Sequence, residues 1–213
     1  MNIKNLKNIK NLKILTTEEL AATAMRSFEA ESASILATKD VFDPEAFKNA
    51  VYLIAKSERT AASGCGHSGV ACAHFAHLLC CIDKTARFLP PSEALHGGLG
   101  FLKAGDVMVL ASRGGRTDEL MPIIDACAKK GVKIIAITEN LESPLAGRAD
   151  IALPMKITTE SDRHNSQGTS SFVALSAVFD ALQAAVIEVL DHTNEQFAVN
   201  HPHGAVGKRL NNK

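Results

Sequence analysis

The sequence has no excess of charge, no long apolar run and no pattern typical of a secretory signal. Lysine and arginine together number 23, as do aspartate and glutamate, so the formal net charge is zero. A neutral chain presents no general basic surface to a polynucleotide, and we expect no nucleic-acid partner. The apolar stretch at 174–190 is interrupted by Asp180, Gln183 and Glu188, so we expect no membrane span. The basic N-terminus lacks the hydrophobic stretch of a leader, which predicts a cytoplasmic protein.

Cysteine is present in an odd number, which argues against a disulfide framework. The five cysteines occur in a chain without an export signal, so we expect reduced thiols. Four of them lie together with three histidines between positions 65 and 81. On a helix, His74, His77 and Cys81 would share one face, so a structural zinc site is an alternative. The spacing matches no closed zinc pattern such as paired Cys-x-x-Cys units, and we predict neither a metal nor another cofactor.

The apolar content is sufficient for one hydrophobic core. Hydrophobic residues make up 46% of the 213 positions, so we expect a biased arm at 1–15 and a single domain over 16–213. Short apolar runs alternate with helical patterns, and two of the runs are continuously apolar, as in parallel strands covered on both faces. This alternation predicts a three-layer α/β sandwich. The expected strands are 60–63, 85–89, 106–112, 133–138 and 151–155, and the expected helices are 17–38, 44–58, 117–130 and 169–191.

Two strand-to-helix loops are the places to seek a ligand, because parallel sheets bind ligands at the carboxyl ends of their strands. The first loop, at 63–69, reads Ser-Gly-Cys-Gly-His-Ser-Gly, in which Gly66 and Ser68 could offer amide and hydroxyl donors to an anion. Its glycine pattern also fits a nicotinamide-binding turn. That alternative needs an acid about 20 residues further on, where Pro-Pro-Ser stands instead. A tight structural turn without a ligand is the third possibility.

The second loop, at 112–117, reads Ser-Arg-Gly-Gly-Arg-Thr. Its hydroxyls, glycine amides and two guanidinium groups are the donors that a phosphate monoester requires. The plain alternative is a turn with two solvated arginines. Two such loops at neighbouring strand ends favour a compact phosphorylated ligand. The candidate phosphate-binding residues are Ser112, Arg113, Gly115, Arg116 and Thr117.

These residues resemble the sugar isomerase (SIS) domain, in its arabinose-5-phosphate isomerase branch of the KpsF/GutQ type. The matching motifs run from the glycine loop at 64–69 through 91–100, 112–119, 137–146 and 169–171 to the His-Pro segment at 201–210. The resemblance implies a flavodoxin-like, Rossmann-like fold with a five-stranded parallel sheet, and a sugar-phosphate ligand. It also implies a homo-oligomer, dimer or tetramer, whose sites are shared between subunits. Because the chain ends soon after His201, we expect the paired CBS domains of longer relatives to be absent.

The resemblance also assigns site residues. The hydroxyls of Thr169, Ser170 and Ser171 would help to bind the phosphate. The catalytic positions of the family correspond to His67, His96, Glu119, Glu160 and His201. Two features depart from the family pattern: His67 stands where the family has lysine, and the 112–116 segment stands where it has Ser-Asn-Ser-Gly-Glu. The second change adds two cations, which indicates an altered substrate.

We therefore predict an aldose–ketose isomerase that acts on a pentose or hexose phosphate through an enediol. Glu160 and His201 are the expected acid/base pair, because modest burial would bring their pKa values toward the working pH. His96 and Glu119 would open the ring or contact sugar hydroxyls, and His67 would give electrostatic support. Four of these five residues also have a simpler reading. Glu119 could complement a helix dipole, Glu160 could be a solvated loop acid, His96 a buried imidazole, and His201 a cap or packing residue. The alternative function is a sugar-phosphate sensor without catalysis.

Overall fold

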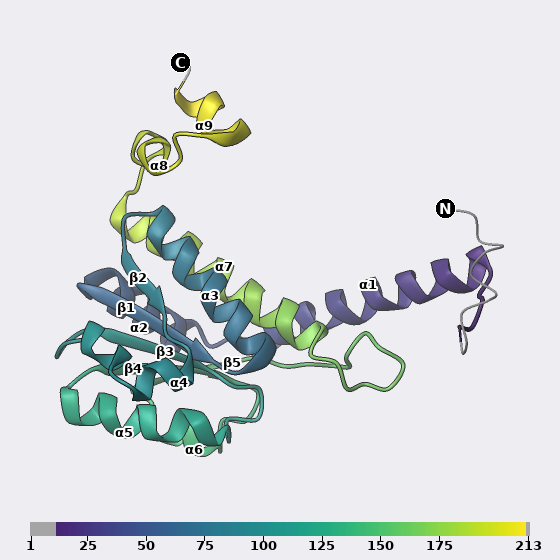
Figure 1. Ribbon diagram of the computed structural model, residues 1–213, viewed down its shortest axis with the longest axis horizontal. Helices are drawn as coiled ribbons and strands as arrows, with labels where there is room; N and C mark the ends of the chain where they lie inside the picture. Colours follow the sequence, from purple (N-terminus) through teal and green to yellow (C-terminus); the bar gives the residue numbers. More distant parts are fainter. Residues whose placement is uncertain (1–11, 212–213) are drawn as a thin grey trace.

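The protein, described by a computed structural model over residues 12–211, contains a five-stranded sheet between two layers of helices (Figure 1). All neighbouring strands are parallel, and their order is β2-β1-β3-β4-β5. The strands are β1 (Arg59–Gly64), β2 (Thr85–Phe88), β3 (Val107–Ala111), β4 (Lys133–Thr138) and β5 (Ile151–Pro154). The predicted α/β sandwich is confirmed. Most of the predicted arm at 1–15 lies outside the described residues.

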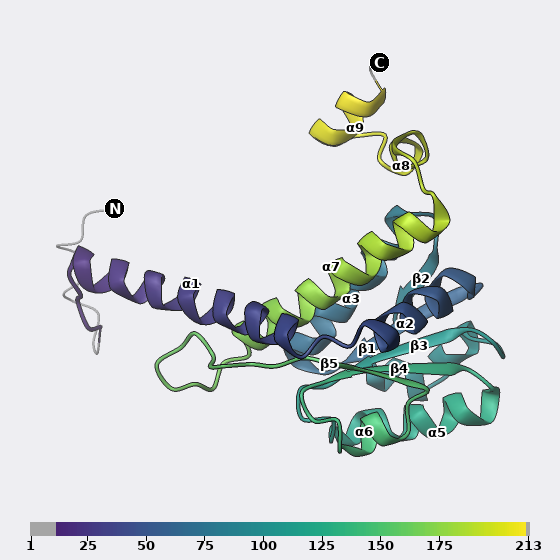
Figure 2. The same cartoon turned by 180° about the vertical axis from the view of Figure 1, so that it is seen from behind.

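Helices cover both faces of the sheet (Figures 1 and 2). Each face has its own apolar core. On one face, α2 (Pro44–Lys56), α3 (Gly66–Cys81) and α7 (Ser170–Leu190) bury side chains against the sheet, and Phe75 stacks on Phe179 with ring centroids 4.4 Å apart. The opposite face is covered by short elements. These are α4 (Pro91–Leu95), the 3₁₀ turns η2 (Gly98–Phe101) and η3 (Asp118–Leu120), α5 (Met121–Lys130) and α6 (Pro144–Gly147).

Helix α7 has the length and apolar composition of a membrane span, and among the described helices it alone does so. It is placed as a core helix, since it contacts α1, α2 and α3. Its core face repeats at the three-and-four spacing of a helix, and Leu175, Phe179, Leu182 and Val186 on this face are buried. Val189, near the end of the helix, is 38% exposed.

Helix α1 (Thr17–Asp40) begins as predicted and projects beyond the sheet (Figures 1 and 2). Thr16 and Glu19 form a reciprocal capping box at its start. Only Ser34 and Thr38 of this helix are buried. These two hydroxyls bind the segment after β5: Ser34 Oγ lies 3.1 Å from Thr158 Oγ1, and Thr38 Oγ1 donates to the Lys156 carbonyl at 3.0 Å. The inner end of α1 therefore supports the chain that leads to Glu160.

Two predicted boundaries were wrong. The glycine loop at 63–69 is shorter than expected, because α3 already begins at Gly66, which has φ +55°. Gly69 lies in the first turn of that helix, where an added Cβ would be 2.6 Å from the Gly64 carbonyl oxygen. The predicted helix at 117–130 is broken into η3 and α5, because Pro122 in the first turn of α5 favours a helix start there.

Removing the N-cap of α2 should weaken the fold modestly. The Asp43 carboxylate accepts hydrogen bonds from the backbone N–H groups of Glu45 and Ala46, both at 3.0 Å. We expect Asp43→Ala to lower the free energy of unfolding by about 1 kcal/mol, measured by urea denaturation. Asp43→Asn, which keeps an oxygen acceptor, is the control and should remain close to wild type. An alanine variant as stable as wild type would contradict this account of the helix start.

Candidate functional site

The candidate site lies at the carboxyl edge of the sheet, where the turns after β1, β3, β4 and β5 meet. After β1, Cys65 leads directly into α3, whose first residues are Gly66 and His67, and the turn after β3 leads to Glu119. These two turns are neighbours because β1 and β3 are adjacent, parallel strands. Burial raises the pKa of the Cys65 thiol, and the negative charge of Glu119 raises it further. Both predicted loops therefore occupy one edge of the sheet, as required for a shared ligand.

The 112–117 turn after β3 is compact and internally hydrogen-bonded. The buried Ser112 Oγ lies 2.8 Å from Thr117 Oγ1 and accepts a hydrogen bond from the Gly115 N–H at 3.1 Å. Gly115 has φ +63°, and an added Cβ would overlap the Ser143 side chain in the loop after β4. The turn thus gathers hydroxyl and amide donors against the next loop, with no space for a side chain at Gly115.

Arg113 points its guanidinium at two carboxylates. Its Nε donates to Glu139 Oε2 and its Nη1 donates to Glu160 Oε1, each at 2.8 Å. Glu139 also accepts the Ile157 N–H through Oε1 at 2.9 Å. Arg113, predicted as a phosphate ligand, links the turns that follow β3, β4 and β5.

Arg116 has different surroundings. Its side chain is exposed, and over residues 12–211 it makes no hydrogen bond or ion pair. Of the two arginines in this turn, Arg116 is therefore the one whose guanidinium N–H groups are all available to a ligand.

Glu160 is buried, with 4% of the residue exposed, which excludes the reading of a solvated loop acid. Its Oε2 accepts from Thr169 Oγ1 at 3.3 Å and from the Ser171 N–H at 3.2 Å. Burial raises the pKa of this carboxyl, but the hydrogen bonds from Ser171 and Thr169 and the charge of Arg113 outweigh burial. The pKa of Glu160 therefore lies below its ordinary value. The expectation that burial would bring it toward neutral pH is wrong.

The three hydroxyl residues at the start of α7 have separate environments. Thr169 Oγ1 accepts from the Ser161 N–H at 2.9 Å as well as donating to Glu160. The Ser170 hydroxyl is fully buried and has no hydrogen-bond partner among the described residues. Ser171 is half-buried and holds Glu160 through its backbone. The loop before α7 lies against α3, since an added Cβ at Gly168 would be 2.8 Å from His67 Nδ1.

The remaining catalytic candidates are not all brought together. His67 is exposed beside Phe172, and Glu119 is exposed at the same edge. His96 follows α4, which contacts η3, and it is exposed, so it is not a buried imidazole. His201 lies elsewhere, after α8 (Asn194–Asn200) and before α9 (Gly204–Asn211).

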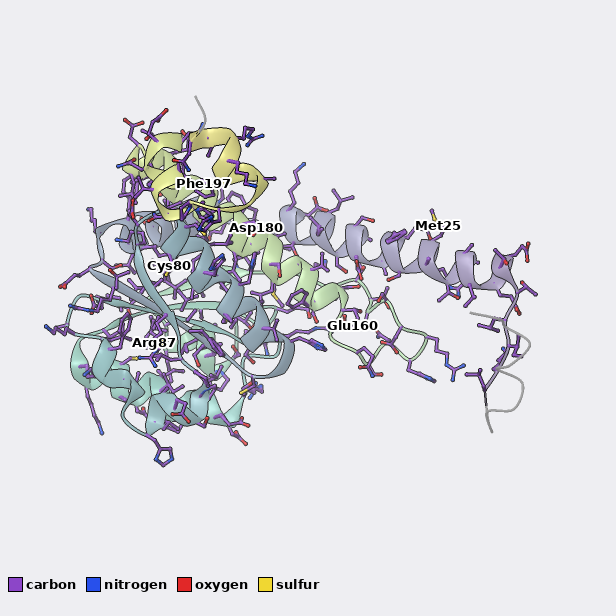
Figure 3. The ribbon with its side chains drawn as sticks, turned by 45° about the horizontal axis from the view of Figure 1, so that its top comes forward. Met25, Cys80, Arg87, Glu160, Asp180 and Phe197 are labelled. Carbon is purple, nitrogen blue, oxygen red and sulfur yellow. The ribbon has the colours of Figure 1, made fainter. Side chains whose placement is uncertain are left out.

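His201 is one helix length away from the sheet edge. Its Nε2 is 3.4 Å from Cys81 Sγ, at the end of the 16-residue helix α3 that begins beside His67. A helix of that length spans about 24 Å. Figure 3 labels Glu160 on the loop that leads to the start of α7, and Phe197, on which His201 stacks, in the C-terminal helices that follow α7. Within one chain, Glu160 and His201 do not form a pair.

The cysteine and histidine residues of α3 form contacts of other kinds. His77 Nε2 lies 3.6 Å from Cys81 Sγ, as the shared helix face predicts, but His74 turns to Asp180 at 3.3 Å. Cys72 is fully buried and packs in the core. No cluster of three or more side chains able to hold a metal ion occurs between residues 12 and 211.

Comparison with known proteins decides the family. A family model described as the SIS domain matches residues 53–185. The chain belongs to the SIS domain family. The arabinose 5-phosphate isomerase KdsD of Pseudomonas aeruginosa is 34% identical over 158 residues, which are 74% of this chain and 48% of that protein. This SIS chain spans about half the length of the curated relatives that it matches.

Solved structures agree with this SIS fold. A protein from Listeria monocytogenes, described as a candidate sugar-phosphate isomerase, is 36% identical and has a TM-score of 0.86, covering 89% of this chain and 100% of that chain. The Escherichia coli CFT073 protein c3406, solved in complex with arabinose 5-phosphate, is 23% identical with a TM-score of 0.81, over 88% of this chain and 100% of that chain. At that identity the second likeness concerns the fold.

Sequence reasoning missed two residues of this candidate site. Glu139 directly follows β4 and receives the Arg113 Nε–H, yet it was not a candidate. A signal was present, because a carboxylate at the carboxyl end of a central parallel strand stands where ligands bind. Asn165, whose side-chain oxygen accepts the Glu160 N–H at 2.7 Å, gave no such signal, since it lies in an irregular loop.

Proposed function

We propose that this SIS protein is an aldose–ketose isomerase that acts on a pentose or hexose phosphate through an enediol. The observation that carries the proposal is the gathering, at one sheet edge, of a hydroxyl- and amide-rich turn, an open arginine and a buried carboxylate. The names of the relatives, arabinose 5-phosphate isomerase and sugar-phosphate isomerase, support this class of reaction. The cytoplasm, where sugar phosphates are made and used, is its proposed location.

The phosphate would bind to the turn at 112–117. Ser112, Thr117 and the neighbouring backbone N–H groups supply neutral donors, and Arg116 supplies a charged fork. The first turn of α3, with the exposed Gly66 and the half-buried Ser68, lies at the same edge and adds the positive end of a helix. The start of α7 supplies a further hydroxyl through Ser171.

The proton transfers would use Glu160 and an imidazole. A carboxylate has about four acceptor positions, and the contacts from Arg113, Thr169 and Ser171 fill three of them at Glu160. The remaining position would take the proton from C2 of the aldose and return it at C1. An imidazole exchanges protons near neutral pH and would carry the proton between the two sugar oxygens. Glu119, His96 and His67 would contact the sugar and assist ring opening.

The imidazole would come from His201 of another copy in a homo-oligomer. Two observations support an assembly with shared sites. His201 lies about 24 Å from the sheet edge of its own chain, by the length of α3. Helix α1 leaves several large apolar side chains in water, and such unpartnered apolar surface is typical of an interface. They include Leu20, Met25, Phe28 and Leu36, which are 55–62% exposed.

A sugar-phosphate sensor without catalysis is the second candidate. The observation that favours it is the ion pair between Arg113 and Glu160, since a carboxylate held below its ordinary pKa is a weaker base. The same turn could still bind a phosphate ester through Arg116.

A panel of pentose and hexose phosphates should distinguish the two candidates. For an isomerase, we expect one aldose phosphate to raise the melting temperature and, in D₂O, to give its ketose with deuterium exchange at carbon, followed by NMR. The matching unphosphorylated sugar is the control and should do neither. Stabilisation without aldose–ketose exchange would reject the isomerase in favour of the sensor, and no stabilisation by any phosphate would reject both.

A further inference from the structure

We propose that Arg113 is a positioning residue rather than a phosphate ligand: it clamps Glu139 and Glu160 and so fixes the loop at 155–169 as a wall of the site. This inference rests on the proposed function, which it deepens by giving the two arginines of one turn opposite roles. Arg113 would orient the carboxylate, and Arg116 would bind the substrate phosphate.

The geometry of Arg113 supports the clamp. Two of its three guanidinium nitrogens point to different carboxylates at 2.8 Å, and these carboxylates follow different strands. The backbone adds to the connection, since the Arg113 carbonyl accepts from the Glu139 N–H at 2.9 Å and from Thr138 Oγ1 at 2.9 Å. A planar fork is suited to hold two carboxylates at once, whereas the single ammonium of a lysine is not.

Glu160 also forms hydrogen bonds with other residues of the loop and with the start of α7. The Glu160 backbone N–H donates to Asn165, and its carboxylate accepts from Thr169 and Ser171 at the beginning of α7. Glu139 receives the N–H of Ile157, where the loop begins. Arg113 therefore contacts two carboxylates that hold both ends of the loop, and its loss would release the loop rather than remove a donor from the phosphate.

Arg113 is the cationic side chain that contacts Glu160 directly. The groove on the α1 side of Glu160 is lined by charged side chains of α1 and of the loop itself, and His67 approaches from α3. None of these forms an ion pair with Glu160 among the described residues. The lining charges are Lys13, Glu19, Arg26, Asp162 and Arg163.

The ligand-free protein provides the first arm of the test. The pKa of Glu160 is lower in the folded protein than in the unfolded chain, where it is about 4.3. The ionised carboxylate therefore stabilises the fold fully above about pH 4.3, and this stabilisation is lost as the pH falls through the folded pKa. In Arg113→Gln the pKa of Glu160 should be lowered less, so acid unfolding should begin at a higher pH than in wild type. Arg116→Gln, the matched control in the same turn, should unfold at the wild-type pH. Arg113→Lys should lie between wild type and Arg113→Gln.

The second arm uses arabinose 5-phosphate as the probe. Arg113→Gln should keep its dissociation constant within about threefold and lower kcat by about 10- to 100-fold, as expected for a misplaced catalytic group. Arg116→Gln should weaken binding by about 10- to 100-fold, the loss of a charged hydrogen bond, with little change in kcat. Equal loss of affinity in both variants, or unchanged acid unfolding in Arg113→Gln, would overturn the proposal. Absence of arabinose 5-phosphate turnover in the wild type would instead reject that sugar as the substrate, while acid unfolding would still test the role of Arg113.

Discussion

Mixing two inactive variants, Glu160→Gln and His201→Ala, is expected to restore about a quarter of the wild-type turnover. Each variant alone should lose about 100-fold or more of kcat, because each lacks one group of the proposed proton transfer. In a mixed oligomer, a site is intact when its loop comes from a His201→Ala chain and its imidazole from a Glu160→Gln chain. Random assembly gives this combination in about one site in four.

The physical reason is the distance along α3. Glu160 is at the carboxyl edge of the sheet, and His201 packs on Cys81 at the far end of that helix. The measurement is turnover after the two variants are unfolded together and refolded, with mixed oligomers identified by a tag on one variant. Each variant refolded alone is the control and should stay inactive. Mixed oligomers without recovered turnover would contradict shared sites.

Replacing Gly115 by valine should abolish phosphate binding and destabilise the domain. The residue has φ +63°, which a β-branched side chain rarely adopts, and an added Cβ would overlap the side chain of Ser143. The turn could accommodate the substitution only by breaking its contacts with the loop after β4. We expect a loss of about 2–4 kcal/mol in the free energy of unfolding, since overpacking and backbone strain add.

The neighbouring glycine is the matched control for this prediction. An added Cβ at Gly114 would meet no atom within 4 Å, and the residue does not have a positive φ. Gly114→Ala should therefore unfold and bind arabinose 5-phosphate much as wild type does. Urea denaturation and the thermal shift with arabinose 5-phosphate measure both effects. If Gly115→Val behaved like Gly114→Ala, the steric account of this turn would be wrong.

The sheet was predictable because its signals are local. Continuous apolar runs such as 107–111 are compatible with a strand buried on both faces, and all five strands were found within two residues of their ends. The helix starts at Thr16 and Asp43 were equally readable, because capping residues act within one turn. The break before α5 was missed, although Pro122 could have signalled it.

The site was less predictable because its contacts connect distant segments. The Ser112 and Thr117 side chains lie in one short turn, and for this reason they are in contact. Both residues were predicted from the sequence. That Arg113 faces Glu160, 47 residues away, depends on the order of the strands and the path of an irregular loop. Its positive charge suggested a phosphate ligand, and only the fold shows that two carboxylates surround it.

The Arg113 fork also constrains how this protein can evolve. The three side chains come from separate stretches of sequence, yet Arg113 pairs with both glutamates. Loss of the arginine leaves a sequestered anion, and loss of either glutamate frees a cation beside the ligand. A neutral exchange at one position is therefore costly until a second position compensates. We therefore expect substitutions at these three positions to be correlated among related sequences, and a change of substrate preference here to involve them as a set.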